Sequence, residues 1–225
     1  MRDIQPPARF SAGTAILVVI GVIVAVIVAL LIAVIVGSGE SSDSTDVPVV
    51  PGASDAPSGD VQQNRPVTVE GQALDRLGDS GADTSIGAPA PALLGANFDG
   101  SSVNVTPGEG GPYMVVFLAH WCPHCNREIP RILEWAATKG VPEGLRIVGV
   151  ATASRNDYPN WPPSAWLNDM GWKWEKMADT QDGQALSAYG GTSFPTMVLV
   201  GPDGTVKNRF SGEIEIADLD RLVRE

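Results

Sequence analysis

Residues 119–125 read Ala-His-Trp-Cys-Pro-His-Cys and contain both cysteines and both histidines of the 225-residue chain. Cys122 and Cys125 form a Cys-x-x-Cys pair, in which the second thiol follows the first by one helical turn. A thiol at a helix N-terminus is stabilised as a thiolate by unpaired backbone N–H groups and by the helix dipole. The pattern therefore predicts thiol-disulfide exchange. A purely structural bridge is disfavoured, because closing so short a loop removes little chain entropy.

The segments that flank the cysteine pair predict a β-α-β unit. Residues 113–119 are a continuous apolar run, typical of a strand buried on both faces of a parallel or mixed sheet. Apolar residues recur at helical spacing from Pro123 to about residue 139, and Pro130 predicts a kink in that helix. A second apolar run at residues 146–151 predicts the next strand, reached by a right-handed crossover.

Further elements are predicted toward the C-terminus. Residues 184–189 predict a short helix, and residues 216–223 predict a closing amphipathic helix. Between them, residues 197–200 and 206–210 flank a Gly-Pro-Asp-Gly hairpin signal.

Residues 158–174 are rich in aromatic residues and proline and hold four of the six tryptophans. Ser164 is expected to cap a short helix that reaches Met170. The aromatic side chains have two interpretations: a binding surface for a partner polypeptide, or a satellite core beneath an inserted helix. The second is favoured, because most aromatic side chains are used in packing.

The N-terminal part of the chain predicts a membrane anchor. Residues 15–36 are uncharged and nearly all Ala, Val, Ile or Leu, and a helix of that length spans about 33 Å. We assign residues 14–36 to a transmembrane helix and residues 1–13 to the cytoplasmic side, because Arg2 and Arg9 precede the span and acidic residues follow it. The alternative, a cleaved signal peptide, normally has a shorter apolar region and a small-residue cleavage site.

The composition after the span predicts a linker and one domain. Residues 37–66 are rich in Gly, Ser, Pro and Asp, as in an extended linker. Residues 67–225 are long enough for a single domain with its own core. The formal charge is −11 and the sequence has no arginine-rich run, so nucleic acid is not an expected partner. The expected location is the cell membrane, single-pass, with the C-terminal domain extracytoplasmic.

Taken together, these features resemble the thioredoxin superfamily. The resemblance rests on the buried strand that runs into Trp121-Cys122-Pro123-His124-Cys125, the helix with Pro130, Phe194-Pro195-Thr196 about seventy residues later, and the Asp203-Gly204 turn. It is strongest for the membrane-anchored TlpA/ResA-like branch, whose opening segment and small hairpin match residues 87–91 and the Asp99-Gly100 turn. Residues 86–225 are covered, and residues 67–85 are not explained by it.

The resemblance implies an α/β thioredoxin fold, a central mixed β-sheet flanked by helices with an N-terminal hairpin extension. It also implies that Cys122 is an exposed nucleophile, that Cys125 is the resolving thiol, and that Pro195 is a cis-proline facing them. The backbone of Phe194 would pair with the substrate strand. Trp121 and Pro123 complete the motif, and neither a metal nor a cofactor is implied beyond the redox-active Cys122–Cys125 disulfide.

Proton handling departs from the pattern of cytosolic thioredoxins. Those proteins carry a buried Asp six residues before the first cysteine, where this chain has Val116. Glu128 matches a glutamate of the TlpA/ResA-like branch, and a partly buried carboxylate there would have a raised pKa and shuttle the proton of Cys125. The alternative is a solvated carboxylate favoured by the helix dipole.

His124 leaves the redox direction open. If His124 stabilises the Cys122 thiolate, the reduced form gains stability and the pair becomes an oxidant. Cys-Pro-His-Cys resembles the motif of DsbA-type oxidants, whereas the surrounding domain resembles branches usually used as reductases. We expect a TlpA/ResA-like reductase, with a DsbA-like oxidant as the alternative. His120 is expected only to pack at the strand end.

Two other classes of function fit less well. A peroxiredoxin would require Thr at the position of Ala119. A copper-binding or copper-delivery module would use Cys122, Cys125 and a histidine, but related modules have a wider cysteine spacing and a distant histidine. The predicted function is therefore a membrane-tethered thiol-disulfide oxidoreductase that acts on extracytoplasmic protein thiols and disulfides. The tether is compatible with a membrane redox partner.

Overall fold

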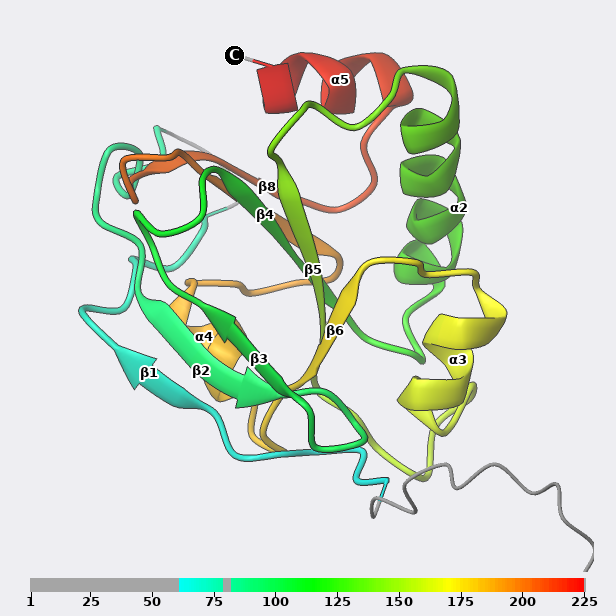
Figure 1. Cartoon of the computed structure of the whole chain (residues 1–225). Helices are drawn as coiled ribbons and strands as arrows, with labels where there is room; N and C mark the ends of the chain where they lie inside the picture. Colours follow the sequence, from blue (N-terminus) through cyan, green and yellow to red (C-terminus); the bar gives the residue numbers. More distant parts are fainter. Residues whose placement is uncertain (1–60, 79–81, 225) are drawn as a thin grey trace, which may run out of the picture. The chain divides into compact units, whose positions relative to one another are not determined.

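The computed structural model describes residues 61–78 and 82–224, so the predicted transmembrane helix at residues 14–36 lies outside the described ranges (Figure 1). No helix within those ranges is long and apolar enough to cross a membrane. The strands are β1 Thr68–Glu70, β2 Ala92–Ala96, β3 Ser102–Val105, β4 Tyr113–Leu118, β5 Arg146–Ala151, β6 Glu175–Ala178, β7 Thr196–Val200 and β8 Val206–Ser211. The helices are α2 Pro123–Thr138, α3 Pro163–Asp169, α4 Gln184–Ala188 and α5 Ile216–Arg224.

The strands form one mixed sheet in the order β1-β2-β6-β5-β4-β7-β8, with β3 paired to β2. The predicted β-α-β unit is confirmed, because β4 and β5 are parallel and α2 connects them. The predicted hairpin of β7 and β8 is antiparallel, and β7 also pairs antiparallel with β4. The cysteine motif therefore follows the C-terminal end of β4, next to the start of the antiparallel strand β7.

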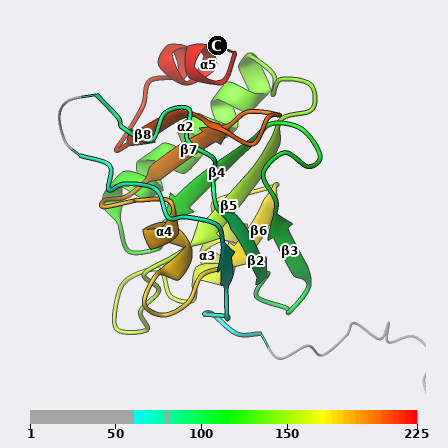
Figure 2. The same cartoon turned by 90° about the vertical axis from the view of Figure 1, so that its left-hand side faces the viewer.

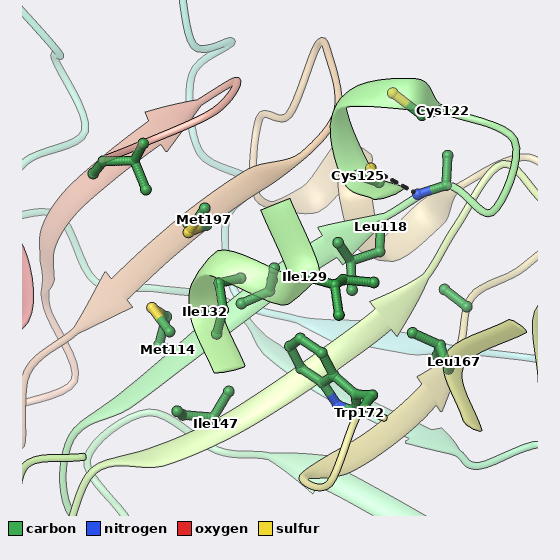
Figure 3. Close-up of a cluster of buried hydrophobic side chains, with 14 of the residues drawn as sticks. Met114, Leu118, Cys122, Cys125, Ile129, Ile132, Ile147, Leu167, Trp172 and Met197 are labelled. Atoms are coloured by element: carbon green, nitrogen blue, oxygen red, sulfur yellow. Dashed lines mark hydrogen bonds between the residues drawn. The ribbon is translucent and has the colours of Figure 1, made fainter. Parts of the chain in front are cut away.

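β4 is buried on both faces, as the sequence predicts, because successive side chains of a strand point to opposite faces. Met114, Val116 and Leu118 belong to a core with α2, α3 and α5, whereas Tyr113, Val115 and Phe117 belong to a second core with α4 and the N-terminal strands. Figure 2 shows α4 in front of the sheet and α2 behind it. Figure 3 shows the first core, in which Ile129 and Ile132 of α2 pack above the sheet.

The predicted N-terminal hairpin is present, and the sheet contains two short strands that the sequence did not predict, β1 beside β2 and β6 between β2 and β5. β2 and β3 pair antiparallel from Leu93↔Val105 to Ala96↔Ser102. β1 lies within residues 67–85 and pairs with β2, while β6 pairs parallel with β5. Three- and four-residue strands are too short for a periodic pattern to identify them.

The end of the predicted linker contacts the domain. The Gln62 N–H donates to the Phe98 carbonyl at 3.0 Å, and the Arg65 N–H donates to the Asp179 carbonyl at 3.2 Å. The Arg65 guanidinium also donates to the Phe98 carbonyl, at 2.7 Å. Hydrogen bonds to the domain therefore extend at least to Gln62, before the predicted domain start at Val67.

The aromatic segment divides between the two interpretations. Trp166 and Trp172 are buried in the first core, and Trp174 packs against it. Gly149 of β5 makes room for this packing, since a Cβ there would lie 2.7 Å from the Trp172 ring. Tyr158 and Trp161, by contrast, are exposed. Packing therefore accounts for the C-terminal part of the segment and not for its beginning.

The predicted cap of α3 is wrong. The N-cap residue is Pro162, which has no side-chain capping bond, and Ser164 lies inside the helix. The Ser164 N–H donates instead to Gln63 Oε1 at 3.0 Å. A residue from the N-terminal segment thus supplies the acceptor that a capping side chain would have supplied.

Candidate active site

The two cysteines lie at the start of α2 in different environments. Cys122 is the N-cap residue, with an extended backbone, and Cys125 lies within the first turn. Both are free thiols. The whole residue Cys122 is 6% exposed and Cys125 is 0% exposed. The expectation of an exposed Cys122 is therefore wrong: its side chain joins the first core, and its thiol donates to the Phe194 carbonyl, with an Sγ–O distance of 3.6 Å.

Cys125 is held in its thiol form. Its Sγ accepts a hydrogen bond from the Ala119 N–H at 3.4 Å (Figure 3). Burial is the main cause that raises the pKa of this thiol, and the charges of Cys122 and Glu128 act in the same direction. Because the thiolate is the reactive species, Cys125 attacks only once its proton has been removed. The site therefore needs a proton acceptor near Cys125.

The loop before β7 faces the motif, as expected for the Phe194-Pro195 pair. The bond between these residues is cis. Pairing of β7 with β4 places Thr196 opposite Phe117, so Pro195 lies beside the end of β4 that leads into the cysteines. The Phe194 ring packs edge-on against the Trp121 ring, with 5.6 Å between centroids. The Phe194 ring and carbonyl thus both contact the cysteine motif.

Glu128 is fully buried on α2, three residues after Cys125. Its Oε2 accepts a hydrogen bond from the Ile214 N–H at 3.2 Å and lies 3.5 Å from Arg131 Nη1. Within the described part of the chain, its Oε1 has no hydrogen-bond partner. Burial raises the pKa of Glu128 to about 7, although the Ile214 hydrogen bond and Arg131 oppose the shift. The predicted burial of Glu128 is confirmed and the solvated alternative is wrong, whereas its role as a proton acceptor stays a prediction.

A surface cluster around Glu213 was not predicted. Glu213 forms ion pairs with Arg127 Nη2 at 2.6 Å and Arg131 Nη1 at 2.8 Å, and its Oε1 lies 2.7 Å from His124 Nδ1. Arg127 and His124 lower the pKa of Glu213 to about 2 through hydrogen bonds. Arg131 contacts both Glu213 and the buried Glu128, so it links the two carboxylates. No sequence signal connects Glu213 to residues that lie more than 80 positions earlier.

The contacts of His124 differ from the expected ones. Its Nδ1 lies 2.7 Å from Glu213 Oε1, so the ring hydrogen-bonds to a carboxylate rather than to the Cys122 thiolate. The side chain is largely exposed and lines an open cavity of about 680 Å³ together with Phe194, Phe210 and Glu213. Within the described ranges, His, Cys, Asp and Glu residues form no group of three or more that could hold a metal ion.

The residues before Cys122 anchor the loop that follows β5. The Trp121 Nε1–H donates to the Ala153 carbonyl at 2.9 Å. His120 is buried, as predicted; its Nδ1 donates to the Pro159 carbonyl at 2.6 Å, and its Nε2 accepts from the Arg155 N–H at 3.2 Å. Burial lowers the pKa of His120. The neutral ring therefore connects the strand end to two points of the loop.

Comparison with known proteins identifies relatives of this chain. The AhpC/TSA family matches residues 86–209. The thiol-disulfide oxidoreductase ResA of Geobacillus thermodenitrificans is 26% identical over 135 residues, which cover 60% of this chain and 74% of ResA. The soluble secreted antigen MPT53 of Mycobacterium tuberculosis is 37% identical over 71 residues, which cover 32% of this chain and 36% of MPT53.

The solved structures include a thiol:disulfide interchange protein of the thioredoxin family from Chlorobium tepidum. It is 30% identical to this chain, with a TM-score of 0.50, and the match covers 64% of this chain and 97% of that protein. The mixed sheet flanked by helices, the cis Phe194-Pro195 bond and the paired cysteines occur together within the matched part of the chain. Sequence similarity and structural similarity thus agree.

Proposed function

The chain belongs to the AhpC/TSA family within the thioredoxin superfamily, and from this premise we propose that it is a thiol-disulfide oxidoreductase. The observation that carries the proposal is the asymmetry of the cysteine pair. Cys122 caps a helix beside the Phe194 carbonyl, whereas Cys125 is fully buried behind it. The names of ResA and of the Chlorobium tepidum protein support the same reaction class.

In the reductive direction, the Cys122 thiolate attacks one sulfur of a partner disulfide. The bond between Cys122 and the partner forms, the partner's own S–S bond breaks, and its second sulfur leaves as a thiolate. Cys125 then loses its proton and attacks Cys122 Sγ, which releases the other partner thiolate and closes the Cys122–Cys125 disulfide. Two electrons have passed to the partner, and a dithiol donor must reduce the pair again. The reverse sequence oxidises a partner dithiol.

Glu128 is the proposed proton acceptor for Cys125. It follows Cys125 by three residues on α2, and residues at that spacing lie on the same helix face. A carboxyl with a pKa of about 7 accepts and returns a proton readily at neutral pH. Oε1 is the atom proposed to take the proton, because Oε2 already accepts the Ile214 hydrogen bond.

We favour the reductive direction. A contact between His124 and the Cys122 thiolate would stabilise the reduced pair and make it oxidising, but His124 is hydrogen-bonded to Glu213 instead. The reduction potential of the protein tests this choice. A value near that of thioredoxin, about −270 mV, supports a reductase, whereas a value near that of DsbA, about −120 mV, supports an oxidant.

Residues 14–36 are proposed to tether the domain on the extracytoplasmic side of the membrane. The pattern of charges around the apolar run supports this orientation, and the name of MPT53 describes a secreted protein. A membrane-impermeant maleimide added to intact cells should label the reduced protein. Labelling that requires permeabilised cells would place the domain on the cytoplasmic side instead.

Trapping experiments on the full-length protein test the exchange reaction. Cys122 should be alkylated faster than Cys125, and Cys122→Ser should abolish reduction of polypeptide disulfides such as those of insulin. Cys125→Ser should accumulate mixed disulfides, because the resolving thiol is missing. The chain contains only these two cysteines, so no other thiol can substitute. Turnover by Cys122→Ser, or equal alkylation of both thiols, would contradict the assigned roles.

A further inference from the structure

The loop between β5 and α3 presents aromatic side chains beside the cysteine motif. Tyr158 is 38% exposed and Trp161 is 39% exposed. The Tyr158 and Trp121 ring centroids lie 5.3 Å apart, and Trp121 in turn packs against Phe194. The Trp161 ring packs edge-on against His120, with 5.8 Å between centroids. Trp121, Tyr158, Trp161 and Phe194, named here the aromatic surface, therefore lie around the two residues that precede Cys122 and the loop that faces it.

Buried groups hold this loop in place. The Asn160 side chain donates to the His120 carbonyl at 2.8 Å, which adds to the two hydrogen bonds of the His120 ring. Ala153, which accepts the Trp121 indole N–H, has a φ of 50°, a value that alanine rarely adopts. An exposed loop fixed by a buried side chain is preorganised, so binding to it costs little ordering entropy.

The charges on this loop are neutralised within it. Arg155 Nη2 pairs with Asp157 Oδ2 at 3.0 Å, and the Arg155 guanidinium lies 4.4 Å from the centre of the Tyr158 ring. The aromatic surface therefore offers a partner apolar area rather than an unpaired charge. Exposed aromatic rings that are already ordered are the side chains that most often anchor a protein interface.

We propose that the aromatic surface binds the polypeptide around a substrate cysteine and selects partners with an aromatic or large aliphatic side chain next to that cysteine. The proposal rests on the proposed function and adds its substrate preference. Any partner sulfur that bonds to Cys122 must come close to Trp121, which precedes Cys122, and to Phe194, whose carbonyl contacts the Cys122 thiol. Tyr158 extends this contact area outward from Trp121, and Trp161 extends it from His120.

Three disulfide substrates test the preference with the full-length protein. Two are peptide disulfides that differ only in the residue beside the cysteine, Leu or Ser, and the third is bis(2-hydroxyethyl) disulfide. The wild type should show a kcat/KM at least about tenfold higher for the Leu peptide than for the Ser peptide, the effect of burying one large apolar side chain. The double substitution Tyr158→Ser with Trp161→Ser should abolish this difference between the peptides by raising the KM for the Leu peptide. Its kcat/KM for the small disulfide should stay within about twofold of the wild-type value.

Two further variants distinguish the loss of substrate binding from a nonspecific loss of structure. Ile86→Ser removes an exposed apolar side chain outside the aromatic surface and should leave the ratio unchanged. Tyr158→Phe with Trp161→Phe should retain the ratio, because it keeps the apolar area. The substrate preference is overturned if the wild type has equal kcat/KM values for the two peptides, or if the double Ser variant keeps the wild-type ratio of these values. Either outcome leaves the proposed reaction class unaffected. No exchange with any of the three substrates overturns the reaction class and this preference with it.

Discussion

Two buried carboxylates in this domain have opposite surroundings. Asp179, directly after β6, and Glu128, on α2, are both 0% exposed. The oxygens of Asp179 accept four hydrogen bonds at 2.7 to 3.2 Å, from the Thr152 hydroxyl and from three backbone N–H groups, two of them in α4. Glu128 accepts one backbone hydrogen bond on Oε2, and in the described part of the chain its Oε1 accepts none.

The difference indicates that two buried carboxylates can differ in hydrogen bonding, and it fits a structural role for Asp179 and the proton-accepting role proposed for Glu128. Burial raises the pKa of both groups, but at Asp179 four donors act against the shift. These donors stabilise the charged form of Asp179 and tie the end of β6 to α4. Glu128 lacks such support, so its proton can be exchanged near neutral pH.

The largest expected effect is on stability, from Asp179→Ala. The substitution leaves several buried donors without an acceptor, and we expect the free energy of unfolding to fall by about 4 kcal/mol. Urea denaturation measures the loss. Asp169, an exposed residue at the end of α3, should change stability by less than about 0.5 kcal/mol when substituted by Ala. If Asp179→Ala lowered the free energy of unfolding by no more than the control substitution does, the four hydrogen bonds would not contribute to stability.

The second prediction concerns pH. The pKa of Glu128 is raised from 4.5 to about 7 in the folded protein, so the folded state holds more protons between these values. Its contribution to stability is therefore present below pH 4.5 and is lost as the pH rises through 7. Glu128→Gln removes this dependence, so the variant should match the wild type at low pH and exceed its stability by about 3 kcal/mol at pH 8. Equal stabilities at pH 8 would contradict the raised pKa.

Third, Glu128→Gln should slow the resolving step by about a hundredfold, equivalent to about 2.7 kcal/mol, because the amide cannot accept the Cys125 proton. Single-turnover decay of the mixed disulfide measures this step directly. Glu134→Gln, an exposed substitution on the same helix, is the matched control and should leave the rate unchanged. If both variants resolve at the wild-type rate, Glu128 belongs with Asp179 as a structural group.

The smallest expected effect comes from His120, a third buried titratable group. Its two ring nitrogens both have partners, so it should behave like Asp179 and stabilise without reacting. Burial lowers its pKa below 6.5, so its contribution to stability is lost as the pH falls below 6.5, opposite in sign to that of Glu128. Stability measured against pH in a Glu128→Gln background isolates this loss. The control is the double variant Glu128→Gln with His120→Gln. If the stability of Glu128→Gln did not fall below pH 6.5 relative to this control, the lowered pKa of His120 would be contradicted.

Much of the fold could be predicted because its central elements have clear local patterns. The apolar run of β4, the helical spacing of α2 and the glycine hairpin between β7 and β8 each have a physical cause within a few residues. The roles proposed for Cys125 and Glu128 came from their spacing on one helix and from family resemblance, and they stay predictions. By contrast, β1 and β6 exist because neighbouring strands offer hydrogen-bond partners, which no local pattern records.

The chain by itself determined the cysteine pair at a helix start and the two-faced burial of β4, because short-range periodicity and residue type set these features; the proline loop opposite followed from family resemblance. Only the tertiary structure decided that His124 contacts Glu213, that Asp179 accepts four hydrogen bonds where Glu128 accepts one, and that Tyr158 is exposed beside Trp121 while Trp172 is buried. These outcomes join residues far apart in the chain. They depend on how strands and loops pack, so neither composition nor spacing can specify them.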